Sequence, residues 1–352
     1  MVKKTIKIGD KIIGYGQSVF VVAEAGVNHN GRLDLALKLI DAAASARADA
    51  VKFQTFRVEQ ATTKHTALAG YQSKNIETDN NLFEEAKCWE LKEGWYPQLI
   101  ARCKKRGIIF FSTPHGGFES VDFLASQKVP LYKFGSGEIT NLPLFTYTAR
   151  LGKPIIFGTG TATMKEIKEA IKAIKKTGNN KIVALHCTTD YPPVLGDVNL
   201  RAMQTMMKEL DVLVGYSDHA LGDHVTVMAV TLGACVIEKH LTLDKNMKGP
   251  DHKASAMPDE FKMMVRKIRN VSIILGSSEK RPVKAELKYI PVIRKSIVAT
   301  KNIKKGEKLT RQNLAIKKPG TGIPPKYWDE IIDKVAKRDI ADDSLLELAD
   351  VG

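Results

Sequence analysis

Eight short runs of apolar and β-branched residues constrain the fold of this chain more than any other feature. Stretches with helical periodicity, such as LDLALKLIDAAASA, separate the runs, and several runs end in small or polar residues. The runs span residues 19–26, 50–54, 108–114, 131–138, 154–160, 181–188, 213–219 and 234–242. Eight strand–helix units in about 250 residues predict an α/β fold of the (β/α)8 or TIM-barrel type. An open doubly wound sheet is the alternative, but no G-x-G-x-x-G opens the first helix.

The composition of the chain changes after Gly276. Residues 277–291 are charged, contain two prolines and lack periodicity, so we expect a linker there. It separates a barrel domain over residues 1–276 from a small, mainly β domain over residues 292–352. About 60 residues form a marginal core by themselves, so we expect the small domain to dock against another surface.

Composition also limits the possible partners. The first residues carry charge without a following apolar segment, and no run approaches the roughly 20 apolar residues of a membrane span, so we expect a cytoplasmic protein without a membrane partner. The net charge of +15 is compatible with nucleic acid, but the lysines are dispersed along helical patterns such as KEIKEAIKAIKK, so we expect no nucleic-acid partner. A basic protein also suits anionic small substrates. The four cysteines form no C-x-x-C pair, which disfavours a disulfide framework or a zinc knuckle.

Polar residues are concentrated where the predicted strands end. A TIM barrel carries its active site at the carboxyl ends of its strands, so these residues are the candidates for chemistry. They are Glu24, Lys52, Gln54, Thr113, Lys133, Ser136, Glu138, Ser217, His219 and His240. Any one of them can be a structural group, but the whole set at one end of a barrel favours an active site.

Alternation along a strand predicts which of these side chains share a face. Ser217 and His219 form one such pair, and Glu238 and His240 form another. Because barrel closure places the eighth strand beside the first, His219, His240 and Glu24 lie on three contiguous strands. Two imidazoles and a carboxylate can then converge on a divalent ion, with manganese, iron, cobalt and zinc all admissible.

Two lysines are predicted inside the same barrel mouth. Lys52 and Lys133, together with nearby hydroxyls, suit a ligand that carries both phosphate and carboxylate. A lysine at a strand end can instead form a Schiff base, as in aldolases, but two lysines beside a candidate metal disfavour that alternative.

Taken together, the sequence motifs resemble those of a known family. The runs AEAGVNHNG, VKFQTF, FSTPHG, KFGSGE, HCTTDYPP, GYSDHALG, IEKHLTLD and GPDHKAS are similar, in their order, to those of the sialic acid synthase family. The run KKPGTGIPP resembles the C-terminal antifreeze-like domain of that family, also called the SAF domain. The resemblance covers residues from about 18 to 350.

The resemblance implies roles for individual residues. It implies that His219 and His240 bind catalytic manganese, and that Glu24 lies near the metal and the reacting carbons as a catalytic residue. It implies that phosphoenolpyruvate contacts Lys52, Thr113, Lys133, Ser136 and Ser217. It implies that the sugar contacts Gln54, Glu138, Tyr191 and Asp251. Lys318, which precedes PGTG, would reach the sugar from the partner subunit of a domain-exchanged homodimer.

Three positions depart from the family pattern. Gly158 stands where the family often has serine, so a hydroxyl expected near phosphoenolpyruvate is missing. Thr189, another expected substrate contact, stands where some members have asparagine. Lys318 replaces the usual arginine, and a lysine cannot form a bidentate fork.

The reaction implied is the condensation of phosphoenolpyruvate with an open-chain N-acetylated hexosamine, with release of phosphate. N-acetylmannosamine, its 6-phosphate and diacetamido-trideoxy sugars all stay open, although HCTTDYP is closer to the sialic and legionaminic branch than to the pseudaminic one. One alternative is a related barrel synthase that acts on a phosphorylated aldose, which the antifreeze-like tail disfavours. Another is a binding protein for nucleic acid or polysaccharide, which the polar strand ends disfavour.

Overall fold

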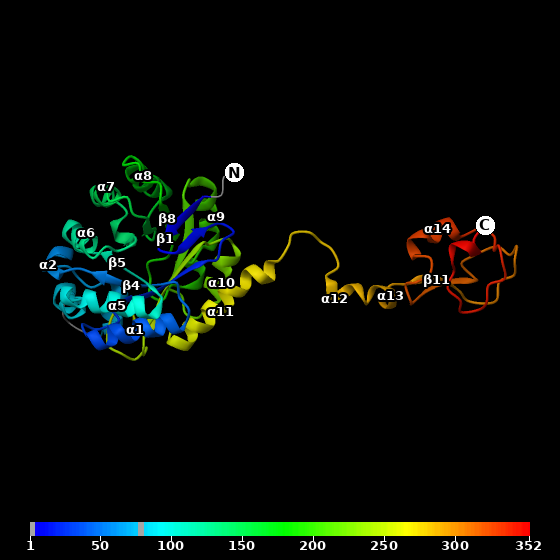
Figure 1. Ribbon diagram of the computed structural model, residues 1–352, viewed down its shortest axis with the longest axis horizontal. Coiled ribbons are helices and arrows are strands. Elements are labelled where there is room, and N and C mark those ends of the chain that lie inside the picture. The colour runs from blue at the N-terminus through cyan, green and yellow to red at the C-terminus, as the bar shows by residue number, and fades with distance from the viewer. Residues whose placement is uncertain (1–3, 77–80) are drawn as a thin grey trace. The chain divides into compact units, whose positions relative to one another are not determined.

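The computed structural model describes residues 4–76 and 81–352 of the chain. These residues form two compact units that divide after Gly276. The first unit holds a parallel sheet with helices around it, and the second holds a small antiparallel sheet (Figure 1).

Eight parallel strands form the centre of the first unit. They are β3 (Phe20–Gly26), β4 (Ala50–Thr55), β5 (Ile109–Pro114), β6 (Tyr132–Phe134), β7 (Ile155–Gly158), β8 (Ile182–His186), β9 (Leu213–Asp218) and β10 (Val236–His240). Their hydrogen-bonded order is β5-β4-β3-β10-β9-β8-β7-β6. The two terminal strands of this order, β5 and β6, also pack against each other. The strands therefore enclose one interior, and the predicted TIM barrel is confirmed.

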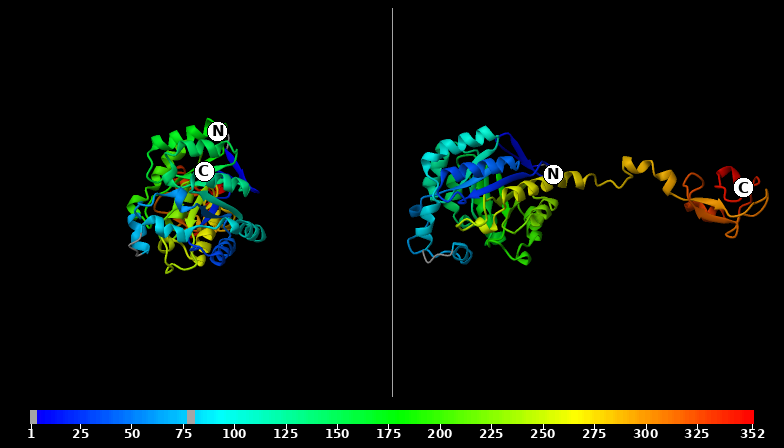
Figure 2. Two further views of the ribbon diagram at one scale, coloured as in Figure 1. Left: turned by 90° about the vertical axis from the view of Figure 1, so that its left-hand side faces the viewer. Right: turned by 90° about the horizontal axis from the view of Figure 1, so that it is seen from below.

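Helices cover the outside of these strands (Figures 1 and 2). The main ones are α1 (Leu33–Ser45), α5 (Tyr96–Arg106), α6 (Gly117–Ser126), α7 (Leu142–Ala149), α8 (Met164–Lys175), α9 (Leu200–Glu209), α10 (His224–Thr231) and α11 (Pro258–Leu275).

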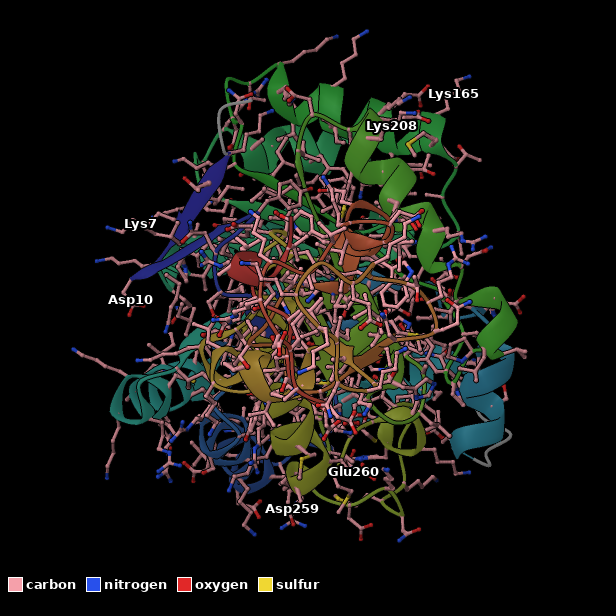
Figure 3. All side chains as sticks on the ribbon, turned by 90° about the vertical axis from the view of Figure 1, so that its right-hand side faces the viewer. Lys7, Asp10, Lys165, Lys208, Asp259 and Glu260 are labelled. Atoms are coloured by element: carbon pink, nitrogen blue, oxygen red, sulfur yellow. The ribbon has the colours of Figure 1, made fainter. Side chains whose placement is uncertain are left out.

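Helix α8 shows why the lysines lie on the outer surface of the barrel. It begins with a capping box between Thr163 and Glu166, and it buries an apolar stripe that includes Ile167 and Ile174. Lys165 on α8 and Lys208 on α9 are exposed at the periphery of the barrel (Figure 3). Lysines of this kind lie on solvated helix faces, as the dispersed pattern predicted.

A hairpin that we did not predict precedes the barrel. Strands β1 (Thr5–Ile8) and β2 (Lys11–Gly14) pair antiparallel, and Ile8 and Ile13 are buried with apolar side chains at the amino ends of the strands. The backbone N–H of Val214 donates a hydrogen bond of 3.1 Å to the Tyr15 hydroxyl. The hairpin therefore closes the end of the barrel where the strands begin.

The inner face of the barrel changes from apolar to polar along the strands. On β3, Phe20 and Val22 belong to the inner apolar cluster, whereas Glu24 follows them on the same face. On β10, Val236 is followed by Glu238 and His240 in the same way. The chemistry is therefore concentrated at the carboxyl ends of the strands.

The connection between β4 and α5 is a long excursion with its own short elements. It contains α2 (Val58–Ala61), α3 (Gly70–Ile76), α4 (Leu82–Ala86), η1 (Lys87–Trp89) and η2 (Glu93–Trp95). Val58, Phe83 and Trp89 pack into a small apolar cluster there. This excursion forms a wall beside the barrel mouth. The periodicity of the sequence did not predict it.

The second unit contains short elements around a core of its own. Its elements are α12 (Lys284–Leu287), α13 (Ile290–Ile293), β11 (Ser296–Ala299), β12 (Leu314–Lys317), η6 (Pro325–Tyr327), α14 (Trp328–Ile331) and η7 (Leu348–Asp350). Ile297, Leu309 and Leu346 are among its fully buried core residues. The predicted linker over 277–291 contains α12 and the beginning of α13, and its described side chains are exposed or half-buried. Within the described part of the chain, no helix is both long and apolar enough to cross a membrane.

Candidate active site

A cavity of about 530 Å³ opens at the carboxyl ends of the strands. Most of the predicted site residues line it, although they come from distant parts of the sequence. Those on its wall are Glu24, Lys52, Gln54, Thr113, Ser136, Glu138, Thr189, Tyr191, His219, His240 and Asp251. Lys133 and Ser217 lie just below them, where both contact Glu238. Thirteen of the predicted residues therefore lie in one place, eleven on the wall and two below it. The strand ends predicted ten of them, and the family resemblance added Thr189, Tyr191 and Asp251.

An ion network of two lysines and two carboxylates forms the floor of the cavity. Lys52 Nζ lies 3.2 Å from Glu24 Oε2 and 3.4 Å from Glu238 Oε2. Lys133 Nζ lies 3.1 Å from Glu238 Oε1. All four side chains are at most 5% exposed, so solvent screens these charges weakly.

The pKa values of the two carboxylates in the network are shifted in opposite directions. Burial raises the pKa of Glu24, and Lys52 offsets only part of that effect. Burial also acts on Glu238, but Lys133 and Lys52 outweigh it and hold the pKa of Glu238 below its ordinary value. Glu238 is thus the ionised partner of both lysines. Alternation along β10 predicts its place on the inner face but not its role.

Glu24 is held by neighbours on the adjacent strand. Gln54 Nε2 donates a hydrogen bond of 3.2 Å to Glu24 Oε1, and Lys52 contacts the other carboxylate oxygen. In the sheet register, Glu24 on β3 lies opposite both His240 on β10 and Lys52 on β4. Its side chain pairs with the lysine rather than with the imidazoles, which differs from the convergence that we expected.

The two histidines lie close together in the cavity. The ring centroids of His219 and His240 are 5.6 Å apart. Tyr191 stacks on His219 at 4.0 Å and meets His240 edge-on at 5.6 Å. The aromatic ring thus holds both imidazoles from one side.

Each imidazole is neutral and presents a lone pair. His219 Nδ1 donates to the carbonyl oxygen of Thr188 at 2.6 Å, which leaves Nε2 unprotonated. His240 Nδ1 has no hydrogen-bond partner among the described residues and lies 3.5 Å from Asp251 Oδ2. Burial lowers the pKa of His219 to about 4 and that of His240 well below its ordinary value.

These donors fit a divalent ion with an open coordination sphere. Neutral imidazole is the form that binds metals, and a buried ring nitrogen without a partner is costly unless a ligand satisfies it. Burial raises the pKa of the neighbouring Asp251 to about 6. Within the described residues, no three histidine, cysteine or acidic side chains are gathered into a complete metal cage. The arrangement therefore suits a metal held by two histidines, with other ligands from water or substrate.

Two of the departures from the family pattern are close in space. A Cβ added at Gly158 would lie 2.8 Å from Ser136 Oγ, so the hydroxyl of Ser136 occupies the space beside that glycine. A Cβ added at Gly160 would lie 2.1 Å from Thr189 Oγ1. The backbone N–H of Gly160 also donates to Ser136 Oγ at 3.0 Å. The two glycines thus make room for the hydroxyls of Ser136 and Thr189.

One further residue of the cavity was missed from the sequence. His115 follows β5 in the FSTPHG run and lines the cavity. A Cβ added at Gly135 would lie 3.2 Å from its Cε1 atom, so the imidazole packs closely over that glycine. Burial lowers the pKa of His115 to about 4, and Lys52 and Lys133 add to this effect. Its position after a strand end was a usable signal, but only Thr113 of this run was chosen.

The excursion after β4 supplies an apolar wall of the cavity. Its apolar lining residues are Phe56, Val58, Ala61, Leu82, Ala86 and Trp89, and the polar Thr62, Thr66 and Gln72 line the cavity beside them. The described side chains of this wall include no lysine or arginine. The cavity therefore has a charged floor and an uncharged, partly apolar side.

Lys318 belongs to the second unit, directly after β12. It is exposed, and a cis peptide bond joins it to Pro319. Its predicted place beside a barrel mouth stays a prediction.

Fold and site together define a TIM-barrel enzyme with lysines, carboxylates and two neutral histidines in one cavity. The model of the NeuB family matches residues 39–280, and that of the SAF domain matches residues 294–352. The chain therefore belongs to the NeuB family, the family of sialic acid synthases, and carries a SAF domain.

Individual proteins of this family are similar over most of the chain. The N,N'-diacetyllegionaminic acid synthase of Campylobacter jejuni is 45% identical over 94% of this chain and 99% of its own length. The enzyme of the same name from Legionella pneumophila is 43% identical over 92% of each chain. The crystal structure of an N-acetylneuraminic acid synthetase from Leptospira borgpetersenii superposes with a TM-score of 0.72 at 34% identity, over 82% of this chain and 95% of that one.

Proposed function

We propose that this enzyme condenses phosphoenolpyruvate with an N-acetylated hexosamine and water to form a nonulosonic acid and inorganic phosphate. The observation that carries the proposal is the proximity of two buried lysines, with Glu238 between them, to two neutral histidines in one cavity. Such a site offers cations for an anionic substrate beside a place for an electrophile.

The bonds that change are few. C3 of phosphoenolpyruvate attacks the aldehyde carbon of the open-chain sugar, which forms the new carbon–carbon bond. Water adds at C2, and phosphate leaves by cleavage of the bond between C2 and its oxygen. Atoms balance because the added water supplies the oxygen that replaces the phosphate ester oxygen on C2.

Lys52 and Lys133 are the proposed partners of the phosphate and carboxylate groups. Hydroxyls from Thr113, Ser136, Thr189 and Ser217 would complete the anion site. Glu238 offsets part of the charge of the two lysines before substrate arrives, since it lies within 3.4 Å of each. These residues would hold the enol in attacking geometry and exclude bulk water.

Glu24 is the proposed group for handling the attacking water. It is buried; Gln54 donates a hydrogen bond to one of its oxygens, and Lys52 Nζ lies 3.2 Å from the other. Since burial raises its pKa, Glu24 can exchange a proton near neutral pH more readily than an exposed carboxylate.

His219 and His240 are the proposed ligands of a divalent metal, with manganese as the metal that we expect. When bound, the ion would supply Lewis-acid polarisation of the aldehyde oxygen. Support comes from the neutral rings, the unpartnered Nδ1 of His240 and the nearby carboxylate of Asp251.

The sugar would contact Gln54, Glu138, Tyr191 and Asp251. The described lining from the β4–α5 excursion holds no lysine or arginine, which favours a sugar with acetamido and deoxy substituents over a sugar phosphate that needs cations of its own. The similarity to two proteins named N,N'-diacetyllegionaminic acid synthase points the same way. We therefore propose a diacetamido-trideoxy hexose as the preferred partner.

We further propose that the enzyme acts in the cytoplasm as a domain-exchanged homodimer, with Lys318 of one subunit at the barrel mouth of the other. The small core of the second unit and the exposed segment before it support this arrangement.

A substrate panel tests the proposed reaction. Phosphate release from phosphoenolpyruvate would be measured with N-acetylmannosamine, its 6-phosphate, a diacetamido-trideoxy hexose and a phosphorylated aldose without an acetamido group, each with and without manganese. We expect release only when sugar and metal are both present, and the highest kcat/KM for the diacetamido sugar. A preference for the 6-phosphate would contradict the sugar assignment, and turnover with a phosphorylated aldose alone would overturn the proposed reaction.

A further inference from the structure

A second buried ion pair lies directly behind the two histidines. Lys239 Nζ donates to Asp218 Oδ2 at 2.6 Å and to the carbonyl oxygen of Ala220 at 2.6 Å. The side chains of Lys239 and Asp218 are 2% and 0% exposed. In the register of β9 and β10, these two residues are direct partners. The pair therefore joins the two strands at the level where both end.

The amine of Lys239 bonds to the residues on either side of His219. Asp218 precedes that histidine and Ala220 follows it, and both accept from the amine of Lys239. Asp218 Oδ1 also accepts from the backbone N–H of Ala220 at 3.0 Å, so the backbone on the two sides of His219 is tied together. Lys239 itself precedes His240. One amine thus fixes the chain next to both histidines.

Helix α10 anchors the same pair from outside the barrel. The Thr226 hydroxyl donates a hydrogen bond of 2.5 Å to Asp218 Oδ2. Because neighbouring residues of a strand point to opposite faces, Lys239 faces the helices whereas Glu238 and His240 face the cavity. Neither residue of the pair lines the active-site cavity, and the polar atoms of the pair are bonded within the protein.

Stability alone is a weak explanation for such a pair. Replacing a buried ion pair by apolar side chains of similar volume is often neutral or stabilising, because desolvation offsets the attraction between the charges. What charged hydrogen bonds add is a fixed geometry. Here the fixed geometry is that of the two strand ends next to His219 and His240.

We propose that Lys239 is a positioning residue, whose bonds to Asp218 and Ala220 set the spacing of His219 and His240 for binding a divalent cation. The inference rests on the proposed metal site, and it adds a residue that contacts neither metal nor substrate. Loss of the amine would leave both imidazoles in place but free to move relative to each other, so the affinity for the cation would fall.

The test measures Mn²⁺ binding to metal-free protein, with the free ion followed by electron paramagnetic resonance. Lys239→Met removes the amine but keeps an unbranched apolar chain. We expect its Kd for Mn²⁺ to rise about tenfold or more, the range found when groups that support metal ligands are removed. Lys239→Arg is the conservative variant. A cavity of about 390 Å³ lined by Leu221, Met263 and Met264 adjoins Lys239 and offers room for the guanidinium, so we expect it to restore most of the affinity.

A matched control separates positioning from general destabilisation. Arg269 on α11 pairs with Asp49 at 2.6 Å, at the opposite end of the barrel. We expect Arg269→Met to lower the Tm without changing the Kd for Mn²⁺. If Lys239→Met does not fold, Thr226→Val, which removes one hydrogen bond to Asp218, should give a smaller loss of affinity in the same direction.

The outcomes distinguish this inference from the metal assignment itself. If the wild-type protein binds Mn²⁺ and the variants at positions 239 and 226 bind it equally well, the positioning role is wrong and the metal site stands. If His240→Ala binds Mn²⁺ as tightly as wild type, or if wild type binds none, the proposed metal site is wrong, and the positioning role is wrong with it.

Discussion

Glu238 Oε1 lies 3.1 Å from Lys133 Nζ beneath the cavity, and the second oxygen of the same carboxylate lies 3.4 Å from Lys52. One buried anion is therefore shared by two buried cations before any substrate binds. An anionic substrate that uses both lysines has to compete with Glu238, so this carboxylate sets the electrostatics of the whole site.

Removing the charge of Glu238 should destabilise the barrel. Glu238→Gln leaves two buried ammonium groups with less compensation, and we expect the free energy of unfolding to fall by about 3 to 5 kcal/mol, the cost of breaking a buried pair. Urea unfolding followed by circular dichroism measures it. Asp34→Asn, which removes an exposed partner of Arg32, is the control and should change stability far less, because solvent screens an exposed pair. Equal effects of the two variants would show that the network is not effectively buried.

Lys133→Ala should weaken the enzyme toward phosphoenolpyruvate far more than toward the sugar. The lysine is assigned to the anionic substrate, and losing one member of a buried charge pair costs about 2 to 5 kcal/mol. Steady-state kinetics with each substrate varied in turn measures both KM values. An unchanged KM for phosphoenolpyruvate would remove Lys133 from the anion site. Trapping of an imine by borohydride would instead indicate an aldolase mechanism.

Gly158→Ser should impair turnover, even though it restores the residue common in the family. The new side chain would start 2.8 Å from Ser136 Oγ, so one of the two hydroxyls has to move. We expect the double variant Gly158→Ser, Ser136→Ala to recover much of the lost kcat/KM for phosphoenolpyruvate, because one hydroxyl then fills the space. A single variant as active as wild type would show that the site tolerates both hydroxyls.

Lys318 should act on the barrel of its partner subunit. We expect co-expression of Lys318→Ala with His240→Ala to restore activity that neither variant has alone. Random pairing makes half of the dimers mixed, with one whole site in each, which gives roughly a quarter of wild-type activity. No recovery would mean that each lysine serves its own barrel, provided that Lys318→Ala is strongly impaired by itself.

The barrel was predictable because each strand repeats one simple pattern. Apolar runs that end in polar residues fix both the strand count and the end at which chemistry lies, and Lys52, Thr113 and His219 follow from that rule. The β1–β2 hairpin and the β4–α5 excursion did not follow from it. Their stability comes from contacts with distant residues, such as the bond from Val214 to Tyr15, which no local periodicity reports.

The same limit explains the errors within the site. Alternation placed Glu238 on the inner face but could not show that both lysines turn toward it. It suggested Glu24 as the carboxylate nearest the histidines, whereas Asp251, on the loop after β10, lies 3.5 Å from His240. Loop residues have no fixed period, so only the family resemblance pointed to Asp251.

The most direct test of the central claim is metal-dependent turnover. Protein treated with a chelator and then dialysed should release no phosphate from phosphoenolpyruvate in the presence of the sugar, and added Mn²⁺ should restore the rate. His240→Ala should lose both Mn²⁺ binding and turnover, because it removes one of the two neutral imidazoles that are the proposed ligands of the ion. Full activity of the metal-free wild-type protein would contradict the account.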